Sequence, residues 1–178
     1  MKNGFRNIHV GTSWNDFFGN KNYEKLYRKN GVETFFNGAA TSFFISRCIY
    51  INLHPKGAII FLNTIDNMDI FINDSTFRSC YTDYQDLPGG SFYWRSSGSC
   101  IQSRNCYYQS WCSKSGQAYG VSVSSNGINH CNFTTLFKIG VDPNKYMFTI
   151  GQSYGNVIIN NNNQTECKCS LVAGFGTT

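Results

Sequence analysis

The feature that most restricts the fold of this chain is a loose repeat in its middle. In each copy an aromatic-rich lead ends in a cysteine, a polar loop of variable length follows, and a glycine precedes a strand-like segment. Three copies contain the segments Cys48–Gly57, Cys80–Gly90 and Cys112–Gly116, and a degraded fourth uses Cys131 and Gly155. One such unit cannot bury its apolar face alone, so units of this kind stack on one another. The repeat therefore predicts a solenoid.

The segments between the turns have the composition of strands. They are short and rich in β-branched and aromatic residues, and Ile70–Ile72 and Val121–Val123 fit burial with a period of two. With 178 residues, 16% aromatic and 14% charged, the chain suits one ordered domain and not a long charged helix. The expected strands are Val32–Phe36, Phe43–Ile51, Ala58–Leu62, Met68–Ile72, Ser91–Trp94, Tyr119–Val123, Tyr146–Ile150 and Asn156–Ile159.

We therefore expect an all-β fold, a right-handed parallel β-helix. Its coils would stack about 4.8 Å apart with parallel pairing, and glycine would allow the tight corners. Cysteine, isoleucine, phenylalanine and valine side chains would fill the interior and pack on their counterparts one coil away. The alternative is an antiparallel β-sandwich, which also uses many short strands but does not require such a repeat.

The basic charge is concentrated at the N-terminus. The chain carries a net charge of +5, and residues 1–30 hold six of its Lys and Arg side chains against two acidic ones. We divide the chain into a basic cap segment, 1–31, and a β-helix domain, 32–178. Within the cap, Asn22 is expected to begin a short helix over 23–29 that ends at Asn30–Gly31. A basic end can contact an acidic partner, and the candidate residues are Lys21, Lys25, Arg28 and Lys29.

Over about residues 41–159 the motif resembles that of a known family. Phe-x-x-Cys, a loop, Gly-Gly or Gly-Ala and an aromatic strand are similar to the right-handed parallel β-helix repeat proteins. The resemblance is to the forms related to polymorphic outer-membrane proteins, which are expanded in some flagellated protists. It implies a surface or scaffold-like role without assigned catalysis.

Aromatic side chains supply a second group of candidate binding residues. They outnumber what a narrow interior can hold, so some are expected to form an outer patch for a protein partner or for sugar rings. Nucleic acid is not expected as a partner, because only Arg95 and Arg104 are interleaved with these aromatics. The aromatic candidates are Tyr93, Trp94, Tyr107, Tyr108 and Trp111.

The candidate catalytic motifs are weak. Gly151–Gly155 matches Gly-x-Ser-x-Gly, but the next residues are strand-like and no histidine follows Ser153. The acidic cluster Asp66, Asp69 and Asp74 could serve a polysaccharide lyase or hydrolase, although aspartate at such positions usually forms turns. No cysteine or histidine spacing fits a zinc site, so we expect no metal. Because the catalytic motifs are also weak, we expect no cofactor and no enzyme activity.

The cysteines and the N-terminus bear on the compartment. Met1–Val10 lacks the apolar core of a secretory signal, and the longest apolar run, Ala58–Leu62, is too short to span a bilayer. We therefore expect an intracellular protein whose eight cysteines are reduced and buried. Glycosylation sequons at Asn73, Asn132 and Asn163 keep a cell-surface protein as the alternative.

These observations favour a non-catalytic structural or binding protein. A stack of coils is a rigid rod with a repetitive face, suited to a protein partner with acidic surfaces. We expect a component of a larger, cytoskeletal assembly. The alternatives are a cell-surface adhesin or carbohydrate-binding module, and a polysaccharide lyase or hydrolase.

Overall fold

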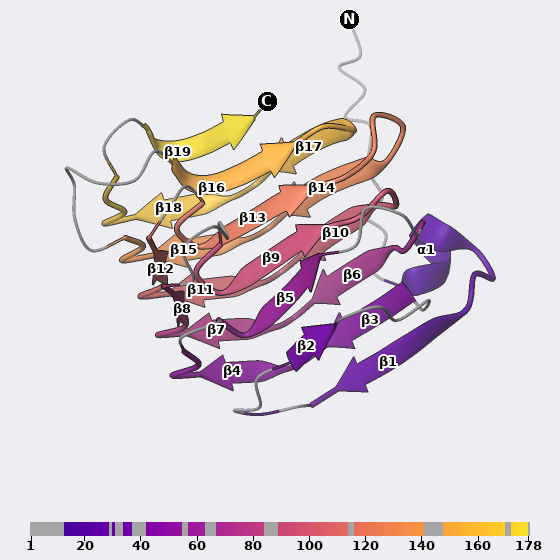
Figure 1. The fold of residues 1–178 in the computed structure, drawn as a ribbon, viewed down its shortest axis with the longest axis horizontal. Coiled ribbons are helices and arrows are strands. Elements are labelled where there is room, and N and C mark those ends of the chain that lie inside the picture. Colours follow the sequence, from indigo (N-terminus) through magenta and orange to yellow (C-terminus); the bar gives the residue numbers. More distant parts are fainter. Residues whose placement is uncertain are drawn as a thin grey trace, which may run out of the picture.

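Parallel strands stacked in coils make up almost the whole molecule. The computed structural model describes residues 13–28, 30, 34–36, 42–54, 57–62, 67–83, 89–113, 116–140, 148–169 and 172–177. The strands form a parallel β-solenoid of about four turns, with the first coil at the bottom and the last at the top of Figure 1. The parallel β-helix is thus confirmed, and the antiparallel sandwich is excluded, because every assigned strand pair is parallel.

Three sheets form the walls of the solenoid. The first sheet is β1 (Tyr23–Tyr27), β3 (Ser42–Ser46), β6 (Ile70–Asn73), β10 (Cys100–Ser103), β14 (Ile128–Asn132) and β17 (Asn156–Asn160). The second sheet is β4 (Ile49–Ile51), β7 (Thr76–Arg78), β11 (Cys106–Tyr108), β15 (Thr135–Phe137) and β18 (Asn163–Thr165). The third sheet is β2 (Thr34–Phe36), β5 (Ile59–Leu62), β9 (Phe92–Arg95), β13 (Tyr119–Ser122), β16 (Phe148–Ser153) and β19 (Val172–Thr177). A small sheet pairs β8 (Tyr81–Thr82) with β12 (Trp111–Cys112).

The register gives the true repeat length. In the first sheet Phe43 pairs with Ile70, Ile70 with Cys100, Cys100 with Asn129, and Asn129 with Val157. In the second sheet, paired residues of neighbouring strands are separated by the same numbers of residues along the sequence. From β3 and β4 onward these two sheets therefore advance by 27 to 30 residues per coil, and equivalent positions lie directly above one another. In the third sheet Ile59 pairs with Phe92, 33 residues further along, because the loops between the sheets differ in length.

The cysteine alignment assigned the wrong register to the repeat. Cys48 follows the corner between the first and second sheets, and its backbone N–H donates to Ser75 Oγ at 3.2 Å. Cys80 follows the next corner, and Cys112 lies in β12 opposite Thr82. The three cysteines therefore occupy three different positions in the coil. The physical reason is that cysteine, serine and threonine are of similar size and replace one another at buried positions.

The glycine alignment was better. A Cβ on Gly57 would lie 2.6 Å from the carbonyl oxygen of Gly90, so these two glycines are in direct contact between coils. The repeat was therefore recognised correctly at Gly57 and Gly90, where the backbones approach too closely for a side chain.

Two columns of residues with positive φ make the remaining corners. The first corner column is Arg28, Arg47, Asp74, Arg104, Phe133 and Asn161, with φ between 50° and 54°. The second corner column is Asn52, Ser79, Gln109, Lys138 and Glu166, with φ between 52° and 56°. Non-glycine residues seldom adopt this conformation, and here the paired strands on both sides hold it.

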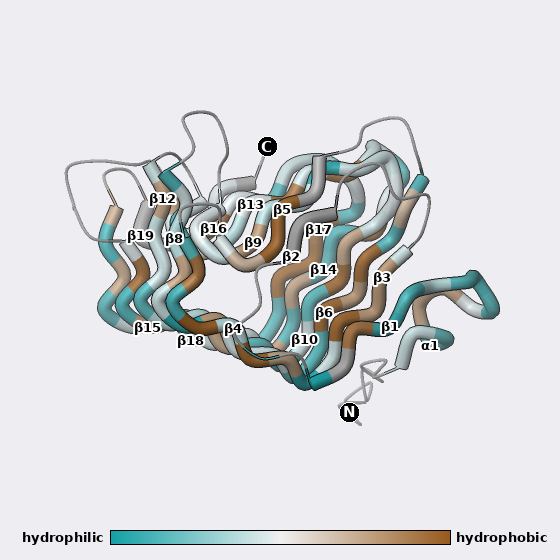
Figure 2. The backbone as a smooth tube through the Cα atoms, turned by 60° about the horizontal axis from the view of Figure 1, so that its bottom comes forward, coloured by the Kyte–Doolittle hydropathy of each residue, from teal (hydrophilic) through white to brown (hydrophobic). Residues whose placement is uncertain are grey.

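The interior is a set of side-chain stacks. Tyr50, Phe77 and Tyr107 stack with ring centroids 5.1 and 4.8 Å apart and nearly parallel planes. Hydrophobic positions of successive coils line up in Figure 2. The interior also holds polar pairs, because Gln152 Nε2 donates to Asn129 Oδ1 at 2.9 Å. Apolar side chains are thus stacked as expected, with hydrogen-bonded amides among them. The expected stacking of cysteine on cysteine is wrong for Cys100 and Cys131, which pair with Asn129 and Gln102.

The N-terminal segment differs from the expectation. Residues 23–27 are not a helix but β1, which pairs with β3 from Tyr23 opposite Ser42 to Tyr27 opposite Ser46. An isolated helix of two turns is marginal, whereas the strand gains a complete ladder. A helix does occur earlier, at α1 (Trp14–Phe18), with a capping box at Ser13.

Helix α1 packs on the outer face of the first sheet. Trp14, Phe17 and Phe18 contact the apolar outer residues of β3, β6 and β10, with Trp14 only 2% exposed. The apolar face of α1 explains why the outward positions Phe44 and Phe71 carry rings. Residues 31–33 lie outside the described residues, so the boundary at residue 31 stays a prediction.

Candidate functional site

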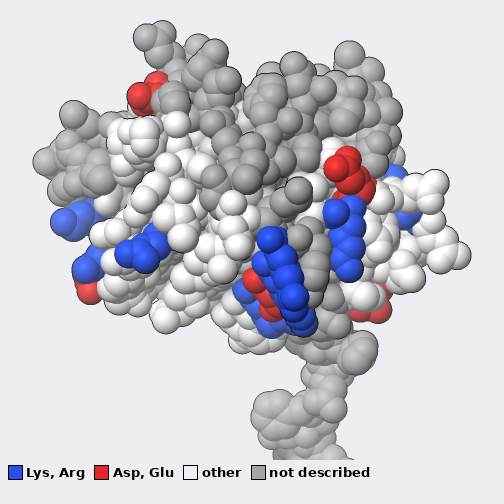
Figure 3. Space-filling model, turned by 90° about the horizontal axis from the view of Figure 1, so that it is seen from below, with Lys and Arg blue, Asp and Glu red and all other residues white. Residues whose placement is uncertain are grey.

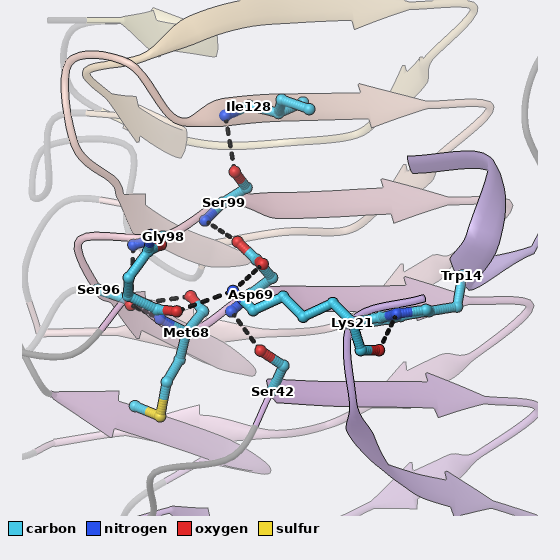
Figure 4. Close-up of polar contacts among 10 residues, drawn as sticks. Trp14, Lys21, Ser42, Met68, Asp69, Ser96, Gly98, Ser99 and Ile128 are labelled. Carbon is cyan, nitrogen blue, oxygen red and sulfur yellow. Dashed lines mark hydrogen bonds and ion pairs between the residues drawn. The ribbon is translucent and has the colours of Figure 1, made fainter. Parts of the chain in front are cut away.

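Asp69, one of the three acidic candidates, interacts with neighbouring residues of the protein. Asp69 is 5% exposed and forms an ion pair with Lys21 at 2.5 Å. It also accepts the backbone N–H of Ser99 at 2.8 Å, while its own N–H donates to Ser42 Oγ (Figure 4). The residues in Figure 4 thus join the N-terminal segment to the successive coils of Ser42, Asp69, Ser99 and Ile128. This arrangement matches a structural role for Asp69, since its carboxylate already has a cation and a donor.

Asp74 is held in a similar way. It belongs to the first corner column and accepts two hydrogen bonds from the guanidinium of Arg104, at 2.6 and 3.1 Å. The Arg104 guanidinium, with a smaller contribution from Arg47, lowers the pKa of Asp74 despite partial burial. Asp66, the third acidic candidate, lies outside the described residues. The two described carboxylates are thus in separate ion pairs.

The basic candidates do not form one free patch. Lys21 is engaged with Asp69, and its ammonium also donates to the carbonyl oxygen of Asn67 at 2.9 Å. Lys25 lies over the ring of Phe44, 5.6 Å from the centroid, and Arg28 has an exposed side chain at a positive-φ corner. Lys29 lies outside the described residues. On the face seen in Figure 3, basic side chains form separate groups, some with acidic ones beside them.

Three of the five aromatic candidates are inside the molecule. Trp94 and Tyr107 are 0% exposed and Tyr93 is 7% exposed, so the expected outer patch is wrong for these residues. Trp94 and Tyr107 point inward from β9 and β11, where the solenoid interior is wide enough for large rings. Tyr108 and Trp111 are partly exposed at the second corner.

The remaining chemical candidates are engaged or isolated. Gly151–Gly155 runs through the end of β16 and a turn into β17, so Ser153 has no helix after it, as the sequence indicates. Among the described residues no group of three His, Cys, Asp or Glu side chains could hold a metal ion. Burial raises the pKa of the Cys80 thiol to about 11, which makes it a poor nucleophile.

In the part of the chain that the structure covers, no helix is long and apolar enough to cross a membrane.

The exposed feature with the most regular geometry is a column of stacked rings at the second corner. His54, Tyr81 and Trp111 each lie two residues after a positive-φ residue of that corner, one coil above another. Their ring centroids are 4.7 and 4.6 Å apart, with interplanar angles of 6° and 9°. Such offset-parallel stacking at the coil spacing gives a flat aromatic face at the Trp111 end.

The ring column ends at a pocket. The next position after Trp111 in the column is Gly140, which has no side chain, and the position after that is Lys168. A cavity of about 410 Å³ lies here, and the described residues that line it are Gln109, Trp111, Lys138, Gly140, Glu166 and Lys168. We define these six residues as the column-end pocket. Lys138 and Glu166 form an exposed ion pair at 3.7 Å within it.

Sequence reasoning found Trp111 but missed the other members of this site. The signal was available, because Tyr81 and Trp111 are separated by one coil length and His54 and Tyr81 by another. It was hidden by the cysteine alignment, which set the repeat in the wrong register. Gly140 could be recognised as the missing ring only once that register was known.

The fold, and not a known relative, is the main guide to the function of this chain. No protein family, no curated protein and no solved structure matches this chain. The resemblance to β-helix repeat proteins is thus confirmed at the level of the parallel β-solenoid and not of a particular family.

Proposed function

We propose that this protein is a non-catalytic binding protein, a rigid β-solenoid component of a larger assembly. The observation that carries the proposal is the alignment of equivalent side chains in columns along the coils. Exposed columns at a fixed spacing form a stiff, repetitive surface, which suits a partner that is itself extended or repetitive. The ring column and the column-end pocket are the most ordered part of that surface.

The state of the acidic groups supports binding over carbohydrate chemistry. A glycoside hydrolase needs two carboxyl groups that face one bond, one of them free to take and give a proton. Asp69 is nearly buried against Lys21, and Asp74 is held by Arg104. Both carboxylates therefore act in this structure as partners of neighbouring cations.

Burial also weakens the support for a glycosylated surface protein. Asn73 and Asn132, two of the three sequon asparagines, are 4% and 7% exposed. A glycan on either would have to displace its neighbours. Asn163 is exposed in β18 and is the position that could carry one.

Co-sedimentation with polymerised actin and, separately, with microtubules tests the proposal. We expect the purified chain to pellet with one of these filaments at low salt and to be released at high salt, since its excess charge is positive. The Lys25→Gln and Arg28→Gln double variant should bind more weakly. A charge-matched control, Arg78→Gln with Arg95→Gln, should bind as the unmodified chain does.

Two results would contradict the proposal. One is a chain that stays in the supernatant with both filaments and also migrates as a single free species in extracts of its native source. The other is turnover of a polysaccharide that is lost in Asp69→Asn while the variant stays folded.

A further inference from the structure

We propose that the column-end pocket binds a flat aromatic ring that carries a negatively charged group. The ring would complete the stack of His54, Tyr81 and Trp111 at the position that Gly140 leaves empty. The inference rests on the proposed function, because it names the chemistry by which the protein holds its partner. The proposal is for a defined binding site for one ring and not for a general apolar surface.

The register of the column places Gly140 directly above Trp111, with no ring at its level from the column itself. The backbone N–H of Tyr81 donates to the carbonyl of Leu53 at 3.0 Å, one coil below. In the same way Gly140 donates to Ser110 at 2.9 Å and Lys168 to Ile139 at 2.8 Å. Tyr81, Gly140 and Lys168 are therefore equivalent positions of successive coils, with Trp111 between the first two as the partner of Tyr81.

A side chain at position 140 cannot fill this space. Gly140 has a φ of +78°, and a Cβ there would lie 2.1 Å from the carbonyl oxygen of Lys168. Any side chain would force apart the backbones of two coils. The space above Trp111 is therefore a consequence of the corner geometry and not of a short side chain.

The height of the space above Trp111 fits one ring. Two coil steps separate the level of Trp111 from that of Lys168, about 9.5 Å. A ring midway would stand about 4.7 Å from each level, close to the 4.6 Å between the centroids of Tyr81 and Trp111. The partly exposed indole of Trp111 supplies the floor of the pocket, and the Lys168 side chain comes from the level above.

The charges of the side chains that line the pocket indicate which substituent the bound ring would carry. Lys138 is paired with Glu166 at 3.7 Å, whereas no carboxylate among the described residues pairs with Lys168. The six described residues that define the pocket thus carry two ammonium groups and one carboxylate, a net charge of +1. An anionic group on the ring would be attracted to Lys168, with Gln109 as a further hydrogen-bond partner at the rim.

Nuclear magnetic resonance of the indole N–H groups in the full chain tests the inference. All three tryptophans lie in the described part of the chain, and Trp14 and Trp94 are buried at 2% and 0% exposure. Ligand at the pocket should therefore move the Trp111 signal alone. The probes are 4-hydroxyphenylacetate, the peptide N-acetyl-Glu-Tyr-Glu-amide, benzyl alcohol as an uncharged ring, and methyl glucuronide as a charged ring that is not flat.

We expect saturable shifts with the first two probes. Trp111→Leu should weaken their binding about tenfold or more, in line with the loss of one aromatic stack. Lys168→Gln should weaken both about threefold to tenfold and change benzyl alcohol binding less than twofold. Tyr154→Leu, at an aromatic residue that is 61% exposed and lies outside both the ring column and the pocket, is the matched control and should leave the affinities unchanged.

The probes also separate the two sources of such a ring. Much tighter binding of the peptide would identify an aromatic side chain beside acidic residues in a partner protein. Equal binding of the two would identify a small aromatic acid. Either result supports the site.

The inference is overturned if none of the probes moves the Trp111 signal at 10 mM (about the weakest affinity worth calling a site). It is also overturned if methyl glucuronide binds more tightly than 4-hydroxyphenylacetate. Because Trp111→Leu could disturb the column, the exposed Lys168→Gln substitution provides the second test. If the chain co-sediments with filaments while no ring binds, this inference fails and the proposed function stands.

Discussion

At the scale of single residues, the corners carry the strain of the fold. Arg47, Asp74 and Arg104 lie above one another with φ between 50° and 54°, a region that costs a non-glycine residue about 1 kcal/mol or more. The hydrogen bonds between the flanking strands of neighbouring coils offset this cost. Where the backbones of two coils come closer still, only glycine fits, as at Gly90.

Gly90→Ala should destabilise the protein strongly. A Cβ at Gly90 would lie 2.3 Å from the carbonyl oxygen of Trp111 and 2.4 Å from that of Gln117. Both atoms are backbone and cannot move alone, so we expect a loss of about 1–3 kcal/mol in the free energy of unfolding. Urea denaturation followed by circular dichroism measures it.

Gly151→Ala is the matched control, because the nearest atom to its Cβ would be 3.9 Å away and its φ is not positive. We expect a change within about 0.5 kcal/mol. Equal effects of the two substitutions would show that contact between coils is not what requires glycine at Gly90.

At the scale of elements, an ion pair fastens the N-terminal segment to the coils. Lys21 lies between α1 and β1, and Asp69 lies immediately before β6. The carbonyl of Lys21 also accepts the indole N–H of Trp14 at 2.9 Å, so the same residue holds the helix. The segment is thus attached by charge at one end and by the rings of α1 at the other.

Lys21→Met should cost about 1–3 kcal/mol, because it leaves the nearly buried Asp69 carboxylate without its cation. The double variant Lys21→Met with Asp69→Asn should recover part of this loss. Lys138→Met, which removes a pair in which both side chains are about half exposed, should cost less than about 1 kcal/mol. Thermal and urea unfolding of the four proteins provides the comparison.

A double variant no more stable than Lys21→Met would show that the uncompensated charge is not the source of the loss. The loss would then come from the packing of the Lys21 stem.

At the scale of the whole molecule, each coil is stabilised by its neighbours. Strands β6, β10 and β14 have a partner on both sides, whereas β1 and β17 end the first sheet as the structure describes it. In a stacked array, opening can begin at an end and proceed coil by coil.

Native-state hydrogen exchange should therefore show a gradient along the solenoid. After correction for intrinsic rates, we expect backbone amides of β10 to exchange at least about tenfold more slowly than those of β17. Mass spectrometry of peptides covering the two strands measures this. Equal protection in both strands would mean that the solenoid opens only as one cooperative unit.

Much of the architecture could be predicted because it depends on local patterns. Strand-rich segments, turn residues and the Gly57–Gly90 repeat all indicated a parallel solenoid. The corner at Arg47 could not be predicted, since Phe43–Ile51 reads as one strand and contains no glycine, proline or asparagine. It is bent there because the stacked corners of neighbouring coils hold Arg47 at φ 54°.

The candidate site shows the same limit. The stacking of coils and the supply of aromatic residues such as Trp111 could be inferred from the amino-acid sequence, because composition and repeat are properties of the chain alone. The burial of Trp94 and Tyr107, and the alignment of His54, Tyr81 and Trp111 into one column, depend on how the coils are folded together. The physical reason is register: a loop of different length moves every later side chain relative to the coil below, and only the summed hydrogen bonding between coils selects one alignment.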